Sequence, residues 1–489
     1  MRRAYFGIGI GCVVLVVLGV ALRMSQGGLG QPVVWVNPVD VHNDAIELVP
    51  IEDQAYPHLA RFYARWSQME LPDEFGDASP GDEGWGDVEE WISTDAVQGL
   101  IDQLEIASGC SVLGAPLHDY EDPIWVREMQ GVGFWSEERS VGRSDGEVLF
   151  MNALLPMPGV IVQGGQVLNA DARMAIERGD TQRLMRDVRI WSRLALFADE
   201  PSVMIGQLVQ LIESAKVSRL IANVLSTNPE LVGEKQASEL ETMFVDMVDA
   251  GVFVLDLELE RKMMEDILRR MVDDQGDADY VQIRDFVPVV QDGDLGVLPA
   301  ASQVLLEDIE PELLAGYIHM VEHGMARVDA IEMPWDLIRV LENEDTWSDG
   351  FTTPAGEIGK ALFPVLSVNG EKLDKAVWVY RSSAQYFIGV RVALAAHRHW
   401  LEHGEPAMRL DEIDADLMGF DPVDGFTGEG LRYRWIDGQP MVYAVGADGD
   451  DDGGIPVQTP DELTGYVLIT DEYLANPGDG DMLLFPLID

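Results

Sequence analysis

The segment 171–226 constrains the fold most, because its apolar residues recur at helical spacing over almost its whole length. It reads DARMAIERGDTQRLMRDVRIWSRLALFADEPSVMIGQLVQLIESAKVSRLIANVLS. Gly179-Asp180 and Glu200-Pro201 interrupt the pattern, and glycine and proline are disfavoured inside helices. The segment therefore predicts three consecutive helices, with Pro201 in the first turn of the third. A chain with such a segment is expected to be mainly α-helical.

Shorter helical patterns flank this segment. AYPHLARFYARW at 55–66 is amphipathic, and STDAVQGLIDQLEIAS at 93–108 begins with hydroxyl side chains that can cap a helix. The stretch 110–165 looks irregular, with strand-like GEVLF and GVIVQGG. Further helices are expected at 237–249, 255–273, 310–330 and 335–343. We therefore expect a helical domain at 56–370, of which a solenoid is one form, although no 34-residue repeat is found.

The tail of the chain has a different pattern. DKAVWVYRSSAQYFIGVRVALAAHRHWLEHG, which starts at Asp374, predicts a long helix that ends at Gly404. Short strand-like segments follow it: LRYRWI, MVYAVG, GYVLIT and DMLLF. A long helix packed on a small antiparallel sheet is an α+β module, which we expect at 374–489.

Parts of this tail resemble a known family. RVALAAHRHWLEHG, FDPVDGFTGEGLRYRW and YAVGADGDDDGG are similar to the carboxy-terminal half of the major pseudopilin of type II secretion. The resemblance implies a helix that leads into a small sheet, a DP turn before the first strand, and a Gly-Asp-Gly-rich loop that binds calcium. The amino terminus lacks the processing site and early glutamate of pseudopilins, so a filament subunit is not expected.

The middle of the chain carries a second resemblance. DARMAIERGDTQRLMRDVRIWSRLALFADEPSVMIGQLVQ is similar to uncharacterised bacterial membrane-anchored proteins that combine a helical body with a pseudopilin-like tail. This similarity implies the same organisation over most of the chain. It implies no activity.

The amino terminus predicts a membrane anchor. Arg2 and Arg3 precede an uncharged, mostly apolar run from Ala4 to Leu22. At about 1.5 Å per residue, a helix of this length just spans a hydrocarbon core of about 30 Å. The positive-inside rule places residues 1–3 in the cytoplasm, the anchor 4–22 in the inner membrane, and a tether at 23–55 outside it. The alternative is a cleaved signal peptide, with Gly19-Val20-Ala21 as the cleavage site.

Charge and cysteine content exclude other classes of function. The chain has 86 acidic and 33 basic residues, a formal net charge of −53. Such a field repels phosphate backbones, so no nucleic-acid partner is expected. It favours cations, basic partners, or solubility in a saline habitat. One of the two cysteines, Cys12, lies in the apolar run, so no intrachain disulfide framework is expected.

One loop has the composition of a calcium site. Asp448, Asp450 and Asp452 alternate with other residues, and Gly453 follows. They match positions 1, 3, 5 and 6 of an EF-hand loop, but the glutamate of position 12 is missing and the flanks are strand-like, which excludes an EF-hand. Alternating carboxylates can still converge on a hard cation, so the three aspartates are candidate calcium ligands. The alternative is a solvated turn.

Two histidine patterns stand out, and one of them is a candidate zinc site. HMVEH matches the H-x-x-E-H pattern of inverted zinc peptidases, with His319 and His323 as zinc ligands and Glu322 as the general base. AHRHWLEHG holds His397, His399 and His403, the last two four residues apart, and here the preference of histidine for the negative end of a helix is the plainer explanation.

Together these features predict a non-enzymatic, single-pass membrane protein. Its exported part is expected to act in binding or envelope assembly with an unknown protein partner, and calcium is the one cofactor that the residues suggest. The alternative is a membrane-anchored zinc metallopeptidase that uses the motif at 319–323.

Overall fold

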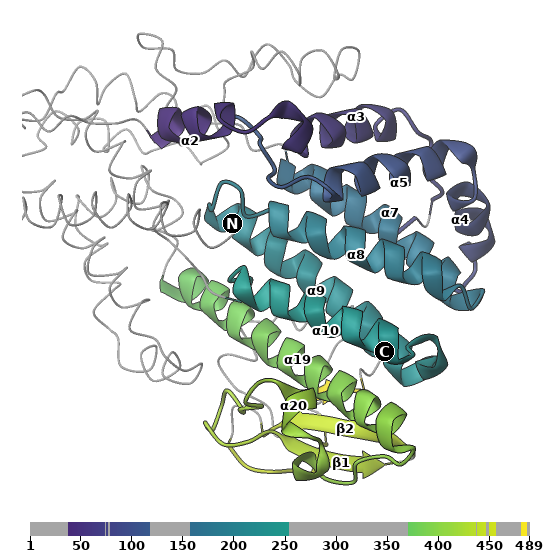
Figure 1. The fold of residues 1–489 in the computed structure, drawn as a ribbon, viewed down its shortest axis with the longest axis vertical. Helices are drawn as coiled ribbons and strands as arrows, with labels where there is room; N and C mark the ends of the chain where they lie inside the picture. Colours follow the sequence, from purple (N-terminus) through teal and green to yellow (C-terminus); the bar gives the residue numbers. More distant parts are fainter. Residues whose placement is uncertain are drawn as a thin grey trace, which may run out of the picture.

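The computed structural model describes residues 38–117, 157–253, 370–455 and 481–486, apart from 74, 77, 78, 437 and 446–448. In these ranges helices dominate, and a small antiparallel sheet lies at one end (Figure 1). The expected mainly helical fold with a small sheet near the carboxy terminus is confirmed. The expected anchor at 4–22 and the helices expected at 255–273, 310–330 and 335–343 lie outside the described residues. Among the helices that the structure does describe, none is sufficiently long and apolar to cross a bilayer.

The helical part precedes a long helix and the sheet. Its helices are α2 (Pro38–Glu47), α3 (Tyr56–Trp66), α4 (Trp85–Ile92), α5 (Asp95–Ser108), α7 (Met157–Glu177), α8 (Thr181–Phe197), α9 (Met204–Thr227) and α10 (Glu234–Asp249). Helix α2 lies within the range expected to be a tether. Its Asn43 side chain donates to the carbonyl of Leu117 at 2.9 Å and accepts from the Leu117 N–H at 2.8 Å, which joins α2 to the segment after α5.

Local sequence explains several helix boundaries. The hydroxyl of Thr94 accepts a hydrogen bond from the Val97 N–H at 3.4 Å and so caps α5. Asp180 caps α8 in the same way, accepting from the Arg183 N–H at 3.1 Å. The long helix α19 (Gly370–His403) ends where Gly404 adopts a φ of 71°, a conformation that glycine tolerates best. The helix breaks expected at 179–180 and at Gly404 are therefore confirmed.

Two local expectations are wrong. GVIVQGG at 159–165 lies inside α7 instead of forming a strand. Its β-branched residues favour strands in isolation, but Val160 and Ile161 are buried among neighbouring helices, and this packing outweighs the local preference. Helix α9 begins at Met204, so Pro201 precedes the helix and does not lie in its first turn.

The helices stack in two layers. Helices α3, α7 and α9 contact one another in series in one layer, and α5, α8 and α10 do so in the other (Figure 1). Gly165 allows close approach between α7 and its neighbours, because a Cβ there would lie 2.2 Å from Glu213 Oε2 and 2.6 Å from Trp191 Nε1. Trp191 also donates its indole N–H to Glu213 at 2.7 Å. The pairing of α7, α8 and α9 thus depends on a glycine and a buried polar contact.

The sheet has the strand order β1-β2-β3, and both pairs are antiparallel. The strands are β1 (Arg432–Ile436), β2 (Gln439–Ala444) and β3 (Met482–Phe485). Arg434 pairs with Met441 in the first ladder, and Tyr443 pairs with Leu483 in the second. The strands expected from LRYRWI, MVYAVG and DMLLF are confirmed. GYVLIT lies outside the described residues.

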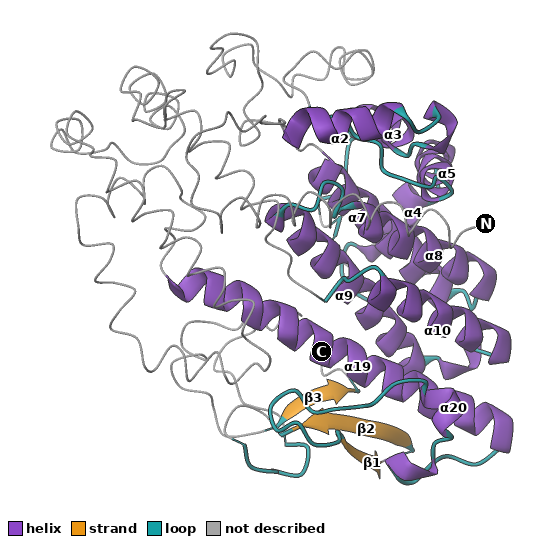
Figure 2. Cartoon of the chain, turned by 60° about the vertical axis from the view of Figure 1, so that its left-hand side comes forward, coloured by secondary structure: helices purple, strands orange, loops and turns teal. Residues whose placement is uncertain are grey.

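Helix α19 joins the helical part to the sheet. It packs against α9 and α10 on one side and against β2 and β3 on the other (Figure 2). Gly389 makes room for β3, because a Cβ at this position would lie 2.3 Å from the Cβ of Leu484. The buried apolar residues from Ala55 to Phe485 accordingly form one continuous core.

A buried ion pair crosses the junction between α10 and α19. The Arg391 side chain is only 6% exposed and lies 2.5 Å from Glu241, whose side chain is 17% exposed. The guanidinium also lies 4.0 Å from the centroid of the Phe420 ring, in a cation–π contact. Charge and packing thus hold the helical part and the tail together.

Glu241→Gln is expected to lower the free energy of unfolding by about 3–5 kcal/mol, because it leaves the buried charge of Arg391 without its counter-charge. Urea unfolding followed by circular dichroism and tryptophan fluorescence measures the loss. Glu239→Gln is the matched control, since Glu239 pairs with the exposed Arg189; a change of about 0–1 kcal/mol is expected there. Equal, small losses of unfolding free energy in both variants would show that the ion pair of Arg391 with Glu241 does not stabilise the junction.

Candidate functional site

The acidic loop follows β2 and is shaped by glycines. Gly449, Gly453 and Gly454 all have positive φ, between 79° and 85°. Of the three candidate calcium ligands, Asp450 is exposed and Asp452 is half-buried, while Asp448 lies outside the described residues. The structure thus places two of the predicted ligands in one tight loop, and their binding of calcium stays a prediction.

Asp451, which the alternating pattern leaves out, makes the bonds that organise the loop. Its Oδ1 accepts from the Tyr443 hydroxyl at 3.1 Å and from the Gly453 N–H at 3.0 Å, and its Oδ2 lies 3.4 Å from Arg432 Nε. Slight burial works to raise the pKa of Asp451, but these hydrogen bonds and the nearby arginines lower it overall. Burial and the bond to Asp451 raise the pKa of Tyr443 to about 12.

Two buried aspartates attach this loop to the rest of the tail. Asp481, just before β3, accepts from the Gly454 N–H at 2.6 Å and donates its own N–H to the Ile455 carbonyl at 2.8 Å. Asp424, in the turn before β1, accepts from the Phe426 N–H at 2.8 Å and from the Val445 N–H at 3.0 Å. Both carboxylates therefore position backbone.

The structure assembles no complete metal site in the ranges it describes. Across 38–117, 157–253, 370–455 and 481–486, no group of three or more His, Cys, Asp or Glu side chains is placed to hold a metal ion. The zinc motif, His319, Glu322 and His323, falls outside these ranges. It stays a prediction.

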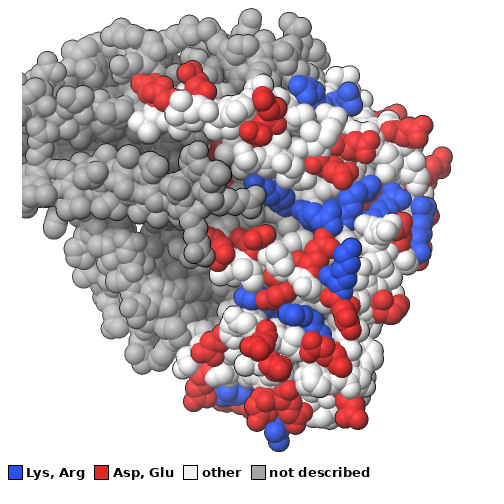
Figure 3. Space-filling view, viewed as in Figure 1, with Lys and Arg blue, Asp and Glu red and all other residues white. Residues whose placement is uncertain are grey.

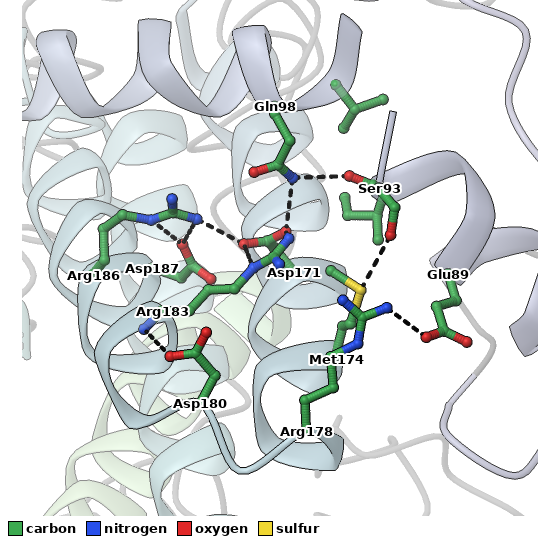
Figure 4. A network of polar contacts seen from close by, with 12 residues as sticks. Glu89, Ser93, Gln98, Asp171, Met174, Arg178, Asp180, Arg183, Arg186 and Asp187 are labelled. Atoms are coloured by element: carbon green, nitrogen blue, oxygen red, sulfur yellow. Dashed lines mark hydrogen bonds and ion pairs between the residues drawn. The ribbon is translucent and has the colours of Figure 1, made fainter. Parts of the chain in front are cut away.

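A buried carboxyl pair forms a second cluster of polar groups (Figure 4). Asp171 of α7 and Asp187 of α8 are both fully buried. Asp171 Oδ2 accepts from Arg183 Nε and from Arg186 Nη2, each at 2.7 Å, and its Oδ1 accepts from Gln98 Nε2 of α5 at 3.2 Å. Asp187 Oδ1 accepts from Arg186 Nε at 2.9 Å. The cluster therefore ties α5, α7 and α8 together.

The two carboxyls of this pair have opposite pKa shifts. Burial, and then the negative charge of Asp171, raise the pKa of Asp187 to about 9, so it is protonated at neutral pH. Burial alone would raise the pKa of Asp171 as well, but hydrogen bonds from Arg183 and Asp187 outweigh it and lower that pKa. The pair thus carries one negative charge between two guanidinium groups. No sequence motif marks it, because its members lie on separate helices.

Basic side chains gather in a band across the described surface, where Figure 1 places α8, while acidic side chains are spread around it (Figure 3). The arginines of α8 have partners inside the fold. Arg183 and Arg186 hold the carboxyl pair, Arg189 pairs with Glu239, and Arg193 donates to the backbone carbonyls of Cys110 and Ser111 at 3.1 and 3.0 Å. These four arginines therefore stabilise the helical layers.

The histidines of α19 have different surroundings. His397 is buried, and its Nε2 lies 2.6 Å from the Val232 carbonyl. Burial lowers the pKa of His397, although the hydrogen bond to Val232 works the other way. His399 and His403 stack on each other at the end of the helix. His397 is therefore a packing residue that joins α19 to the turn before α10.

Comparison with known proteins adds no further assignment. No family model, curated protein or solved structure matches this chain.

Asp187→Asn and Asp171→Asn are expected to have very different effects on the free energy of unfolding. The raised pKa of Asp187 means that its contribution to stability is complete below its unfolded pKa, near 3.8, and is lost as the pH rises to about 9. Asparagine keeps the neutral form, so Asp187→Asn should be at least as stable as the parent at pH 7 and should lose less stability above it. Asp171→Asn should be less stable by about 3–5 kcal/mol, because two arginines lose their counter-charge.

Urea unfolding between pH 5 and 9.5 measures both effects. Asp180→Asn is the matched control, since asparagine also caps helices well and should leave α8 intact. If Asp187→Asn lowers the free energy of unfolding at pH 7 as much as Asp171→Asn does, the prediction that Asp187 is neutral is wrong.

Proposed function

We propose that this chain is a non-enzymatic binding or assembly protein, held at the bacterial inner membrane by residues 4–22 and exposed outside it. The observation that carries the proposal is that these buried ionisable groups in the described ranges make structural contacts. Asp424 and Asp481 hold backbone N–H groups, Asp171 and Asp187 hold helices, and His397 binds a carbonyl. Groups committed to structure in this way support a scaffold rather than a reaction centre.

The arrangement of the helices supports the binding role. Paired helices stacked in series are the geometry of a short α-solenoid, a fold that offers extended faces to a partner. We propose this form for the body. The ion pair of Arg391 with Glu241 would then keep the tail at a fixed position relative to those faces. The net charge of −53 favours a basic protein partner over an anionic one.

We further propose that calcium stabilises the tail. Gly449 and Gly453 fold the acidic loop tightly, and Asp451 and Asp481 attach it to the sheet. Carboxylates brought together in such a loop repel one another, and a divalent cation relieves that repulsion. Binding here would couple the loop to β2 and β3, and through them to α19.

Calcium is expected to raise the melting temperature of the full-length chain relative to chelator at constant ionic strength. Ligand that binds only the folded state adds about 2.7 kcal/mol at a hundredfold excess over Kd. Asp448→Asn together with Asp450→Asn should abolish the effect of calcium. Asp102→Asn together with Asp249→Asn removes the same charge from exposed helix positions and should leave the effect intact. Equal responses to calcium and magnesium, or an unchanged response in the first double variant, would identify the loop as a solvated turn.

The anchor predicts a defined topology. A reporter that is active only outside the cytoplasm should be active when fused to the carboxy terminus, because the charges before 4–22 keep the amino terminus inside. Membrane fractionation and amino-terminal sequencing of the purified protein complete the measurement. Activity of a cytoplasm-only reporter would overturn the topology, and a mature chain that starts near Leu22 would replace the anchor by a cleaved signal peptide.

A further inference from the structure

The end of α19 brings two imidazoles together. His399 and His403 lie one helical turn apart, and their rings stack with centroids 4.2 Å apart and an angle of 19° between the planes. His403 is exposed and His399 is half-buried, so the pair is accessible from solvent. Imidazole binds metals in its neutral form.

The hydrogen bonds show which nitrogens are available. His403 Nδ1 lies 3.0 Å from the backbone carbonyl of His399. A carbonyl oxygen only accepts, so Nδ1 carries the proton and Nε2 of the neutral ring keeps its lone pair. A second nitrogen bonded to a backbone carbonyl is the usual support of a metal-binding histidine. Within the described part of the chain, Nδ1 of His399 is buried and has no hydrogen-bond partner. Neither ring is committed to the core in the way that His397 is.

We infer that His399 and His403 form a two-histidine site for a divalent transition-metal ion such as Zn²⁺, Ni²⁺ or Cu²⁺, with water as the remaining ligands. Each metal–nitrogen bond is about 2.0–2.1 Å long, so two nitrogens on one ion lie within about 4 Å of each other. The stacked rings, with centroids 4.2 Å apart, direct their in-plane lone pairs nearly parallel, so binding one ion requires at least one of the two rings to rotate until both nitrogens face it.

The surroundings favour a cation at this place. The site lies in the last turn of α19, where the helix dipole is negative, and the exposed Glu402 and Glu405 flank it. Imidazole selects zinc, nickel and copper over calcium and magnesium, which prefer oxygen. The site is therefore chemically distinct from the acidic loop. A bound ion would bridge successive turns and hold the last turn of α19 just before Gly404, where the chain leaves the helix.

The test uses the full-length protein without a polyhistidine tag, purified in chelator and then dialysed free of it. Ni²⁺, Zn²⁺ and Cu²⁺ are titrated against a chromophoric chelator, and melting is followed in parallel. One equivalent of metal should bind and raise the melting temperature. His399→Ala and His403→Ala should each weaken binding by about tenfold or more, the scale expected even for the loss of an outer-shell partner. Nitrogen couplings in the Cu²⁺ electron paramagnetic resonance spectrum should be lost with either variant.

Two controls separate this site from others. Glu402→Gln changes the neighbouring charge without removing an imidazole and should retain most of the affinity. His319→Ala together with His323→Ala removes the H-x-x-E-H motif and should leave this site intact. If binding follows that double variant instead, or if His399→Ala and His403→Ala bind as the parent does, the two-histidine site is wrong.

Discussion

The buried ion pair between Arg391 and Glu241 holds the helical body and the tail of this protein in a fixed position relative to each other. Arg391 lies on the helix that also supports the sheet, and Glu241 lies on the last helix of the layered body. A guanidinium in the interior is tolerated only with a counter-charge close by. Separating α10 from α19 would leave Arg391 without its counter-charge, which is energetically costly. The body and the tail are therefore expected to unfold together.

The same principle explains why so many ionisable residues occur inside a strongly acidic protein. Asp171 is matched by two arginines and by the proton of Asp187, and Asp424 is matched by backbone N–H groups. Each arrangement satisfies a buried charge with short-range donors. Two polar features of the described tail lie at its surface. They are the acidic loop after β2 and the stacked imidazoles of His399 and His403.

Those two surface groups would give the tail two kinds of cation chemistry. A loop of carboxylates suits a hard ion that prefers oxygen, whereas a pair of imidazoles suits a borderline transition metal. Both features lie at the ends of elements that pack on the common core, the loop after β2 and the last turn of α19. Because the tail and the layered helices share one core, ion binding at either place would stabilise both parts against unfolding.

The sequence by itself determined α3, α5, α8, α9, α10, α19 and several helix caps, because these depend mostly on contacts within a few residues, whereas α2, α4 and the start of α7 were not expected as helices. Thr94, Asp180 and Gly404 act on their own helix ends. Tertiary structure decided what local pattern could not. Val160 and Ile161 became helical because neighbouring helices bury them. Alternation along the chain marked Asp448, Asp450 and Asp452 as candidate calcium ligands. The residue that attaches the loop to the sheet is Asp451, through contacts with Tyr443 on the adjacent strand and Arg432 on the next. The carboxyl pair forms only when α7 and α8 pack together, because the burial and the neighbouring charges that shift the two pKa values come from the packed helices.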